Sequence, residues 1–277
     1  MSGWSYLESH PAHYHDPLPD VAKIAQEEWL VLSYFCNLNE VDLHVYYDAD
    51  FFENTNSLAA AYRLIWFIDG KWKSGALNRH GEKGRIVIRV NPNVPNGWYN
   101  DDGSCNTGYR FDMRTMIRHE LLHGIGITSS IREDSVGYTL PHTSICALPE
   151  LDEHMHTADG GPYLSGCSFT ETRMPDAFVS DVQLFNPFIY MPGSSFHHTA
   201  EQGILYYAMR PGVCMQYDQN ALTLLNEIGA ECQSELLQFR STRQGMMNFS
   251  ATVRNINLFV YIMFMYMIKC LMIRSMN

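Results

Sequence analysis

The sequence predicts an α+β fold, with an N-terminal lobe of strands and helices, a loop-rich C-terminal lobe and a cleft between them. Segments with strand and helix periodicity alternate up to residue 125. Beyond Gly126 the chain is polar and rich in turn signals such as Gly160-Gly161-Pro162. A chain of 277 residues can bury a substantial core. We therefore expect one domain that is split by a cleft, or two small lobes.

Hydrophobic periodicity predicts the elements of the N-terminal lobe. We expect a helix over residues 21–37, a strand over 41–47, a helix over the alanine-rich residues 57–68 and a strand over 85–90. The segment 91–97, rich in Asn and Pro, then breaks the regular structure. These elements supply the sheet and the helices of the first lobe.

A helix is also predicted to follow Asp112, which stands at an N-cap position. Its apolar face is formed by residues at helical spacing: Met113, Met116, Ile117 and Leu121. Gly124 and Gly126 fit a C-terminal cap and an abrupt turn, because glycine adopts positive φ without a Cβ penalty. Much later in the chain, residues 221–229 favour another helix that is closed by glycine.

The helix after Asp112 carries His119-Glu120-Leu121-Leu122-His123-Gly124-Ile125-Gly126. Residues four apart stand one above the other on a helix, so both imidazoles can face one cation while Glu120 points to the same side. Zinc in a hydrolase usually has three protein ligands and an open position for water, and a nearby carboxylate can take the proton of that water. The spacing predicts His119 and His123 as ligands of Zn2+ and Glu120 as the general base. The alternative is a helix whose two histidines only pack or face solvent.

A strand beside such a helix can bind an extended peptide if it lies at the edge of its sheet. We take residues 86–90 as the candidate for this strand, and an interior strand fits the sequence equally well.

Around the helix that carries His119 and His123 and in later segments, the sequence resembles the metzincin metalloproteases, and among them the leishmanolysin-like group. The resemblance covers about residues 86–232. It is carried by HELLHGIG, by histidines after a Gly-Ser-Ser run, by Met209 as a candidate Met-turn residue and by ALTLLNEIG at 221–229. It implies a metzincin-like zincin whose active-site helix ends the N-terminal lobe, residues 1–125. Residues 126–235 would then form the C-terminal lobe with the third ligand and the Met-turn.

The resemblance also bears on the third zinc ligand. In metzincins of the usual pattern this histidine lies six residues after the second, where this chain has Ser129, and a hydroxyl is a poor zinc ligand. Leishmanolysin-like enzymes place it after a long insertion, close before the Met-turn, which implies His198. The Trp-Glu that follows it in the family is Thr199-Ala200 here. The other candidates are His197, His142, His154, His156 and Asp152.

These features together predict a zinc-dependent endopeptidase that hydrolyses internal bonds of a protein or peptide substrate. Two alternatives stay open. One is a catalytically inactive zinc-binding adhesion or interaction module of the same fold. The other is a zinc hydrolase of a non-peptide substrate, because the helix motif sets the metal chemistry and not the substrate.

The charge is distributed unevenly along the chain. Residues 1–239 hold 14 of the 19 basic residues and all 30 acidic residues, a balance of 14 − 30 = −16, which argues against nucleic acid as a partner. Residues 240–277 hold five basic residues and no acidic ones. We expect the tail, residues 236–277, to lie outside the catalytic fold. Its 11-residue apolar run, 258–268, is short of the roughly 20 residues of a spanning helix, so a membrane anchor and a poorly ordered extension are both open.

Six of the seven cysteines lie before residue 239, and none forms a CxxC pair. They could form three disulfides or remain reduced, and the sequence does not give the connectivity. Disulfides would favour an extracellular or membrane-associated location. Residues 1–20, however, contain no apolar segment typical of a signal peptide.

Overall fold

The computed structural model describes residues 5–6, 18–68, 71–77, 83–99, 105, 107–134, 137–139, 148–165, 168–169, 176–187, 190–191 and 193–239. The chain divides into two units, one of residues 1–101 and 105–239 and the other of residues 102–104 and 240–277. All the elements described below belong to the first unit.

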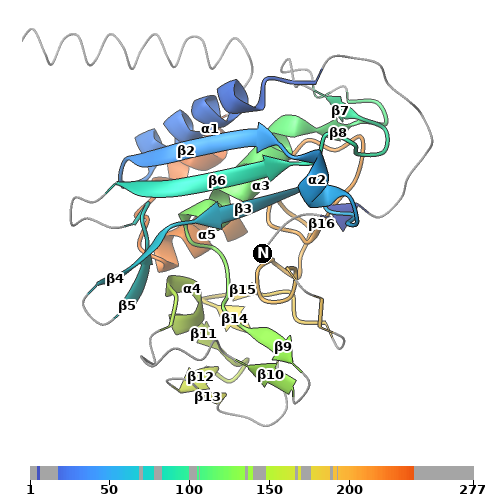
Figure 1. Ribbon diagram of the computed structural model, residues 1–277. Helices are drawn as coiled ribbons and strands as arrows, with labels where there is room; N and C mark the ends of the chain where they lie inside the picture. Colours follow the sequence, from blue (N-terminus) through green and yellow to red (C-terminus); the bar gives the residue numbers. More distant parts are fainter. Residues whose placement is uncertain are drawn as a thin grey trace, which may run out of the picture. The chain divides into compact units, whose positions relative to one another are not determined.

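A three-stranded sheet with the order β2-β6-β3 organises the first half of this unit (Figure 1). The central strand β6 (Gly84–Val90) pairs parallel with β2 (Val41–Tyr47) and antiparallel with β3 (Ala59–Arg63). Alternate side chains of β6, among them Ile86 and Ile88, are fully buried. One face of the sheet is therefore apolar and has to be covered.

Two helices, α1 (Val21–Phe35) and α3 (Met113–Ile125), pack on the sheet and on each other. Each begins at an aspartate whose side chain accepts a hydrogen bond from the backbone N–H three residues later, at 3.0 Å for Asp20 and 2.8 Å for Asp112. Such caps satisfy N–H groups that have no partner within the helix. The predicted N-cap at Asp112 is confirmed.

Helix α3 lies very close to β6 at Gly124. A Cβ atom at this position would be 2.6 Å from Cγ2 of the buried Ile86. The helix continues past Gly124 to Ile125, and Gly126 is its C-cap. The predicted end of the helix is thus correct, but Gly124 permits close packing and does not cap.

The other elements of the unit are short. In its second half, the described residues form mainly loops and sheets of two or three short strands. The remaining elements are β1 (Ser5–Tyr6), α2 (Ala49–Phe52), β4 (Ile65–Ile68), β5 (Lys71–Ser74), β7 (Trp98–Tyr99), β8 (Phe111–Asp112), β9 (Arg132–Asp134), β10 (Gly137–Thr139), α4 (Glu150–Glu153), β11 (Met155–His156), β12 (Leu164–Ser165), β13 (Ser168–Phe169), β14 (Phe178–Val179), β15 (Val182–Gln183), β16 (Ala208–Met209), α5 (Gln219–Glu227) and the 3-10 helix η1 (Ser234–Gln238). The pairs and sheets among these strands are β4-β5, β7-β8, β9-β10, β12-β13, β11-β14-β15 and β1-β16.

Two expectations about the first lobe differ from the structure. Residues 57–68 do not form a helix, because the alanines pair with β6 as part of β3, and Ile65–Ile68 pairs with β5 as β4. Pairing and burial override the helix preference of alanine. Residues 86–90 belong to the interior strand and not to a sheet edge, so they are paired on both sides and cannot bind a peptide substrate there.

The compact unit continues to Phe239, beyond the predicted boundary at residue 236, which falls inside η1. Leu236 is buried, and the ring of Phe239 lies 5.7 Å from that of Phe35 at the end of α1. The tail from residue 240 onward, with its possible anchor, lies outside the described residues. Within the part of the chain that is described, we find no helix with the length and apolar character needed to cross a membrane.

Two disulfides join segments that are distant in the sequence, Cys36 to Cys232 and Cys105 to Cys214. The first links the end of α1 to the segment after α5, and the second links the segment before α3 to the one after β16. Cross-links of this kind typically stabilise a fold by about 2–4 kcal/mol. The other three cysteines lie outside the described residues.

Candidate metal centre

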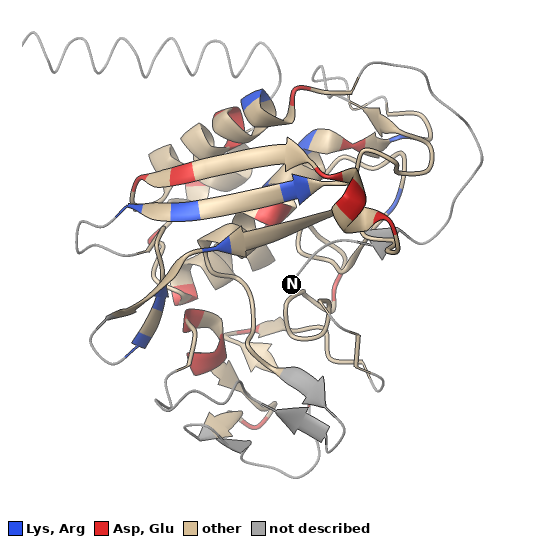
Figure 2. Cartoon of the chain, viewed as in Figure 1, with Lys and Arg blue, Asp and Glu red and all other residues tan. Residues whose placement is uncertain are grey.

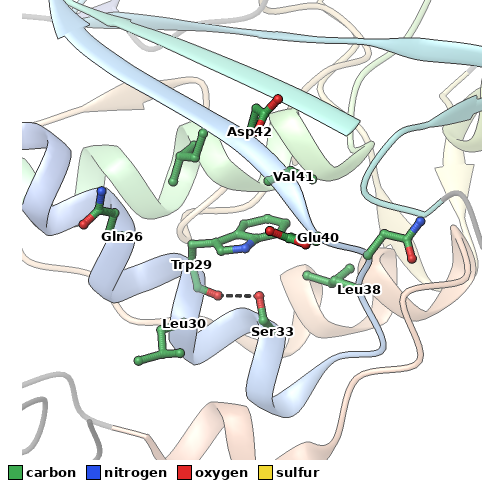
Figure 3. Close-up of a pocket in the computed structure, with 10 residues that line it drawn as sticks. Gln26, Trp29, Leu30, Ser33, Leu38, Glu40, Val41 and Asp42 are labelled. Atoms are coloured by element: carbon green, nitrogen blue, oxygen red, sulfur yellow. Dashed lines mark hydrogen bonds between the residues drawn. The ribbon is translucent and has the colours of Figure 1, made fainter. Parts of the chain in front are cut away.

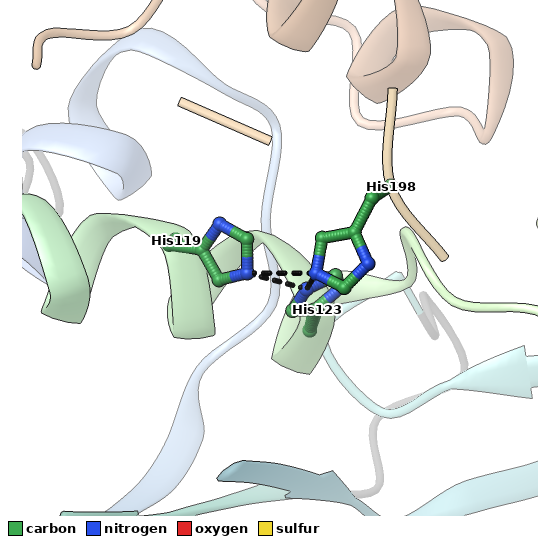
Figure 4. Close-up of side chains that lie close together, drawn as sticks. All are labelled: His119, His123 and His198. Atoms are coloured by element: carbon green, nitrogen blue, oxygen red, sulfur yellow. Dashed lines mark hydrogen bonds between the residues drawn. The ribbon is translucent and has the colours of Figure 1, made fainter. Parts of the chain in front are cut away.

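The side chains of His119, His123 and His198 converge on one point (Figure 4). The Nε2 atoms of His119 and His123 are 2.9 Å apart, and that of His198 lies 3.1 Å from the first and 3.3 Å from the second. Two of the residues come from α3 and the third from the segment that precedes β16, and all three are buried. The structure therefore brings together the three histidines that the sequence predicts as ligands.

The other ring nitrogen, Nδ1, of each histidine is held by a backbone carbonyl oxygen. These oxygens belong to Ile204 for His119 at 2.6 Å, to Ile127 for His123 at 2.6 Å and to Ser194 for His198 at 2.9 Å. A carbonyl oxygen can only accept, so each Nδ1 carries the proton and donates it. Burial lowers the pKa of all three imidazoles, to about 4 for His198, and thus favours their neutral form. Each Nε2 therefore presents an unprotonated lone pair.

Three lone pairs directed at one point cannot hydrogen-bond to one another. The dashed lines in Figure 4 thus mark close approaches of acceptors, and a cation would relieve their repulsion. Two nitrogens bound tetrahedrally at 2.0–2.1 Å from a zinc ion are about 3.3 Å apart, close to the separations found here. The donor set fits a first-row transition metal ion in general, because imidazole also binds copper, iron and nickel.

Glu120 lies next to His119 in α3 and is fully buried. Met209, the candidate Met-turn residue, is also buried and lies in β16, immediately before a turn at Pro211 and Gly212. The burial and placement of Glu120 and Met209 do not test their predicted roles, which are general base for Glu120 and Met-turn residue for Met209.

The other predicted ligand candidates have different partners. The imidazole of His197 contacts the hydroxyl of Thr128 and the backbone N–H of Ser129. Asp152 accepts a hydrogen bond from the backbone N–H of Ser130 at 2.8 Å, and His154 lies 3.7 Å from Glu227. The ring nitrogens of His156 bind the carbonyl oxygens of residues 157 and 180. None of these four belongs to the histidine group. His142 lies outside the described residues.

The C-terminal end of α3 is held by residues from two strands and a short helix. Arg63 of β3 donates to the carbonyl oxygen of His123 at 3.3 Å, and Ser74 of β5 donates to that of Gly124 at 3.2 Å. Glu150 of α4 pairs with Arg63 at 3.6 Å and accepts a hydrogen bond from the backbone of Ser74. Figure 2 shows the acidic helix α4 near the basic residues of β5. The last turn of a helix leaves carbonyl groups without helical partners, and these contacts satisfy two of them.

A buried group of charges fixes the other part of α3. Glu28 of α1 accepts from Arg114 at 2.8 Å and from Nε of Arg118 at 3.0 Å, and both arginines belong to α3. Arg118 also donates to the carbonyl oxygen of Met215 at 2.6 Å. This cluster ties α1, α3 and the segment before α5 together, directly beside His119.

A separate open pocket of about 540 Å³ lies between α1 and the start of β2 (Figure 3). It is lined by Gln26, Trp29, Leu30, Ser33, Leu38, Asn39, Glu40, Val41, Asp42 and Leu43. No residue of the histidine group contributes to this lining, so the pocket is distinct from the candidate metal centre.

Comparisons of this chain with family models, with curated proteins and with solved structures found no match. The case for a function therefore rests on the residues and their geometry.

Sequence reasoning missed Arg63, Glu28 and Arg118 as supports of the site. A signal existed for Glu28, which interrupts the apolar stripe of α1 seven residues after Val21 and four before Leu32. A charge in such a stripe indicates a buried partner. No comparable signal marks Arg63, because its partners come from distant parts of the chain.

Proposed function

We propose that this chain is a zinc-dependent endopeptidase, with His119, His123 and His198 as the metal ligands. The observation that carries the proposal is the convergence of three Nε2 lone pairs, each oriented by a hydrogen bond from Nδ1 to a backbone carbonyl. Such bonds fix the tautomer and the ring orientation of metal-binding histidines. Among the residues that the structure describes, the set contains three protein ligands and no fourth, which is the composition typical of catalytic zinc sites and not of structural ones.

When bound, zinc would act as a Lewis acid that lowers the pKa of a water molecule and polarises a substrate carbonyl. Glu120 is the residue that we assign to proton transfer, since it follows His119 in a helix that is buried along its whole length. Its carboxylate would accept a proton from the attacking water and return it to the leaving amine. Hydrolysis of an internal peptide bond results.

The proposed substrate is an extended protein or peptide segment. The two disulfides support an extracellular or membrane-associated location, because such bonds persist in oxidising compartments. The tail adds the possibility of membrane attachment, which is a prediction from the sequence alone.

A substrate panel tests the reaction. The zinc-loaded full chain is incubated with an unstructured protein, with internally quenched peptides and with small esters, each with and without a chelator. We expect internal cleavage of the protein and peptides, its loss on chelation and its return with added zinc. Hydrolysis of esters alone would indicate a non-peptide hydrolase. Stoichiometric zinc without turnover of any substrate would indicate a binding module.

A further inference from the structure

His197 is adjacent to the third histidine of the group but binds a different part of the chain. Its Nδ1 atom lies 3.1 Å from the backbone N of Ser129 and 2.7 Å from Oγ1 of Thr128. The N–H of Ser129 can only donate, so this Nδ1 accepts, and the Thr128 hydroxyl donates to the same atom. Neutral His197 thus carries its proton on Nε2, opposite to the tautomer of the three histidines in the group.

The loop that His197 holds leads directly to one of those three histidines. Residues 127–130 follow the C-cap of α3, and the carbonyl oxygen of Ile127 accepts the hydrogen bond from Nδ1 of His123 at 2.6 Å. Ile127 immediately precedes Thr128. A continuous set of contacts therefore runs from His197, through two hydrogen bonds to the loop, to the imidazole of His123.

The backbone before these histidines is held in an unfavourable conformation. Phe196 is fully buried and has a φ of 64°, in the left-handed region that large side chains rarely adopt. Its backbone N–H donates to the carbonyl oxygen of Phe185 at 2.8 Å. Beyond this residue, the two consecutive histidines reach different partners, His197 the loop and His198 the metal group.

We propose that His197 is a positioning residue, which orients His123 through the 127–130 loop and thereby raises the affinity of the three-histidine group for its metal. The inference rests on the metal site of the proposed function, and it does not depend on peptide hydrolysis. It assigns His197 a role other than that of the alternative third ligand.

Two substitutions separate positioning from packing. His197→Asn keeps an acceptor close to the position of Nδ1, whereas His197→Leu fills similar space without any acceptor. Ser195→Ala is the matched control, because Ser195 is buried in the same turn and its Oγ accepts from the backbone of Met191 at 2.9 Å. Cobalt(II) is the probe, since its visible spectrum reports the number and geometry of the ligands.

We measure cobalt affinity and the cobalt spectrum of each full-length variant, and thermal unfolding of each metal-free form. His197→Leu is expected to bind cobalt about 10-fold more weakly, at the lower end of the effect of residues that support metal ligands, with His197→Asn and Ser195→Ala close to wild type.

Equal affinity of His197→Leu and wild type would overturn the inference, as would equal weakening in His197→Asn and His197→Leu. A cobalt spectrum of His197→Leu with one imidazole fewer would instead make His197 a ligand. Wild-type cobalt binding without peptidase activity would reject the proposed reaction and leave this inference standing.

Discussion

Glu120→Gln should reduce peptide hydrolysis by about 10²- to 10⁴-fold, while the protein still binds zinc as wild type does. The amide is close in size to the carboxylate, so the packing of the buried side chain is preserved, but it cannot accept a proton from water at neutral pH. The loss should appear mainly in kcat, because the substituted group acts in the transition state.

Glu201→Gln is the matched control for this variant. Glu201 lies three residues after His198, is exposed, and is the nearest carboxylate that follows the third histidine in the sequence. Its substitution should leave hydrolysis within about twofold of wild type. Hydrolysis by Glu120→Gln at the wild-type rate and with equal zinc content would remove Glu120 from the mechanism.

Glu28→Ala should lower the free energy of unfolding by about 3–5 kcal/mol. The substitution leaves the buried guanidinium of Arg118 without its carboxylate partner, and it leaves the buried Arg114 with only the partly exposed Glu27. Glu27→Ala is the control, since Glu27 pairs with the same Arg114 but is partly exposed, and its loss should cost about 0–1 kcal/mol. Chemical denaturation followed by circular dichroism measures both values. Equal effects of the two substitutions would show that the buried carboxylate of Glu28 contributes no more to stability than the partly exposed carboxylate of Glu27.

The same cluster makes the stability depend on pH. Burial alone would raise the pKa of Glu28, but the charges and hydrogen bonds of Arg118 and Arg114 outweigh it and hold the pKa below the ordinary 4.5. The contribution of Glu28 is therefore complete above about pH 4.5 and is lost as the pH falls through the lower folded-state value. Glu28→Gln should lose this part of the acid dependence.

Much of the first lobe follows from local pattern. The alternation of residues 41–47 and 85–90 corresponds to β2 and to all of β6 except its first residue. The apolar stripe of residues 21–37 contains all of α1, which ends two residues earlier than predicted. The alanines of residues 57–68 misled the prediction, because their strand conformation comes from pairing with β6, some 30 residues later in the chain. Local propensity contains no information about such a partner.

The metal centre was likewise predictable only in part, because the sequence indicates the ligands but not the groups that orient them. The spacing of His119 and His123 follows from helical geometry, and the resemblance adds His198. The carbonyl groups that orient the three rings belong to Ile127, Ser194 and Ile204, whose identities carry no signal because the backbone is the acceptor. The same holds for His197, since only the folded loop reveals that it binds Ser129.

The number of zinc ions per chain, measured after dialysis against metal-free buffer, tests the three-histidine site most directly. We compare wild type with His123→Ala, His198→Ala and His154→Ala, the last being a control for a histidine that lies beside Glu227 and outside the group. Wild type and His154→Ala should retain about one zinc per chain, whereas His123→Ala and His198→Ala should both lose it, because either leaves only two of the three protein ligands. Retention of about one zinc per chain by His198→Ala would contradict the site proposed here.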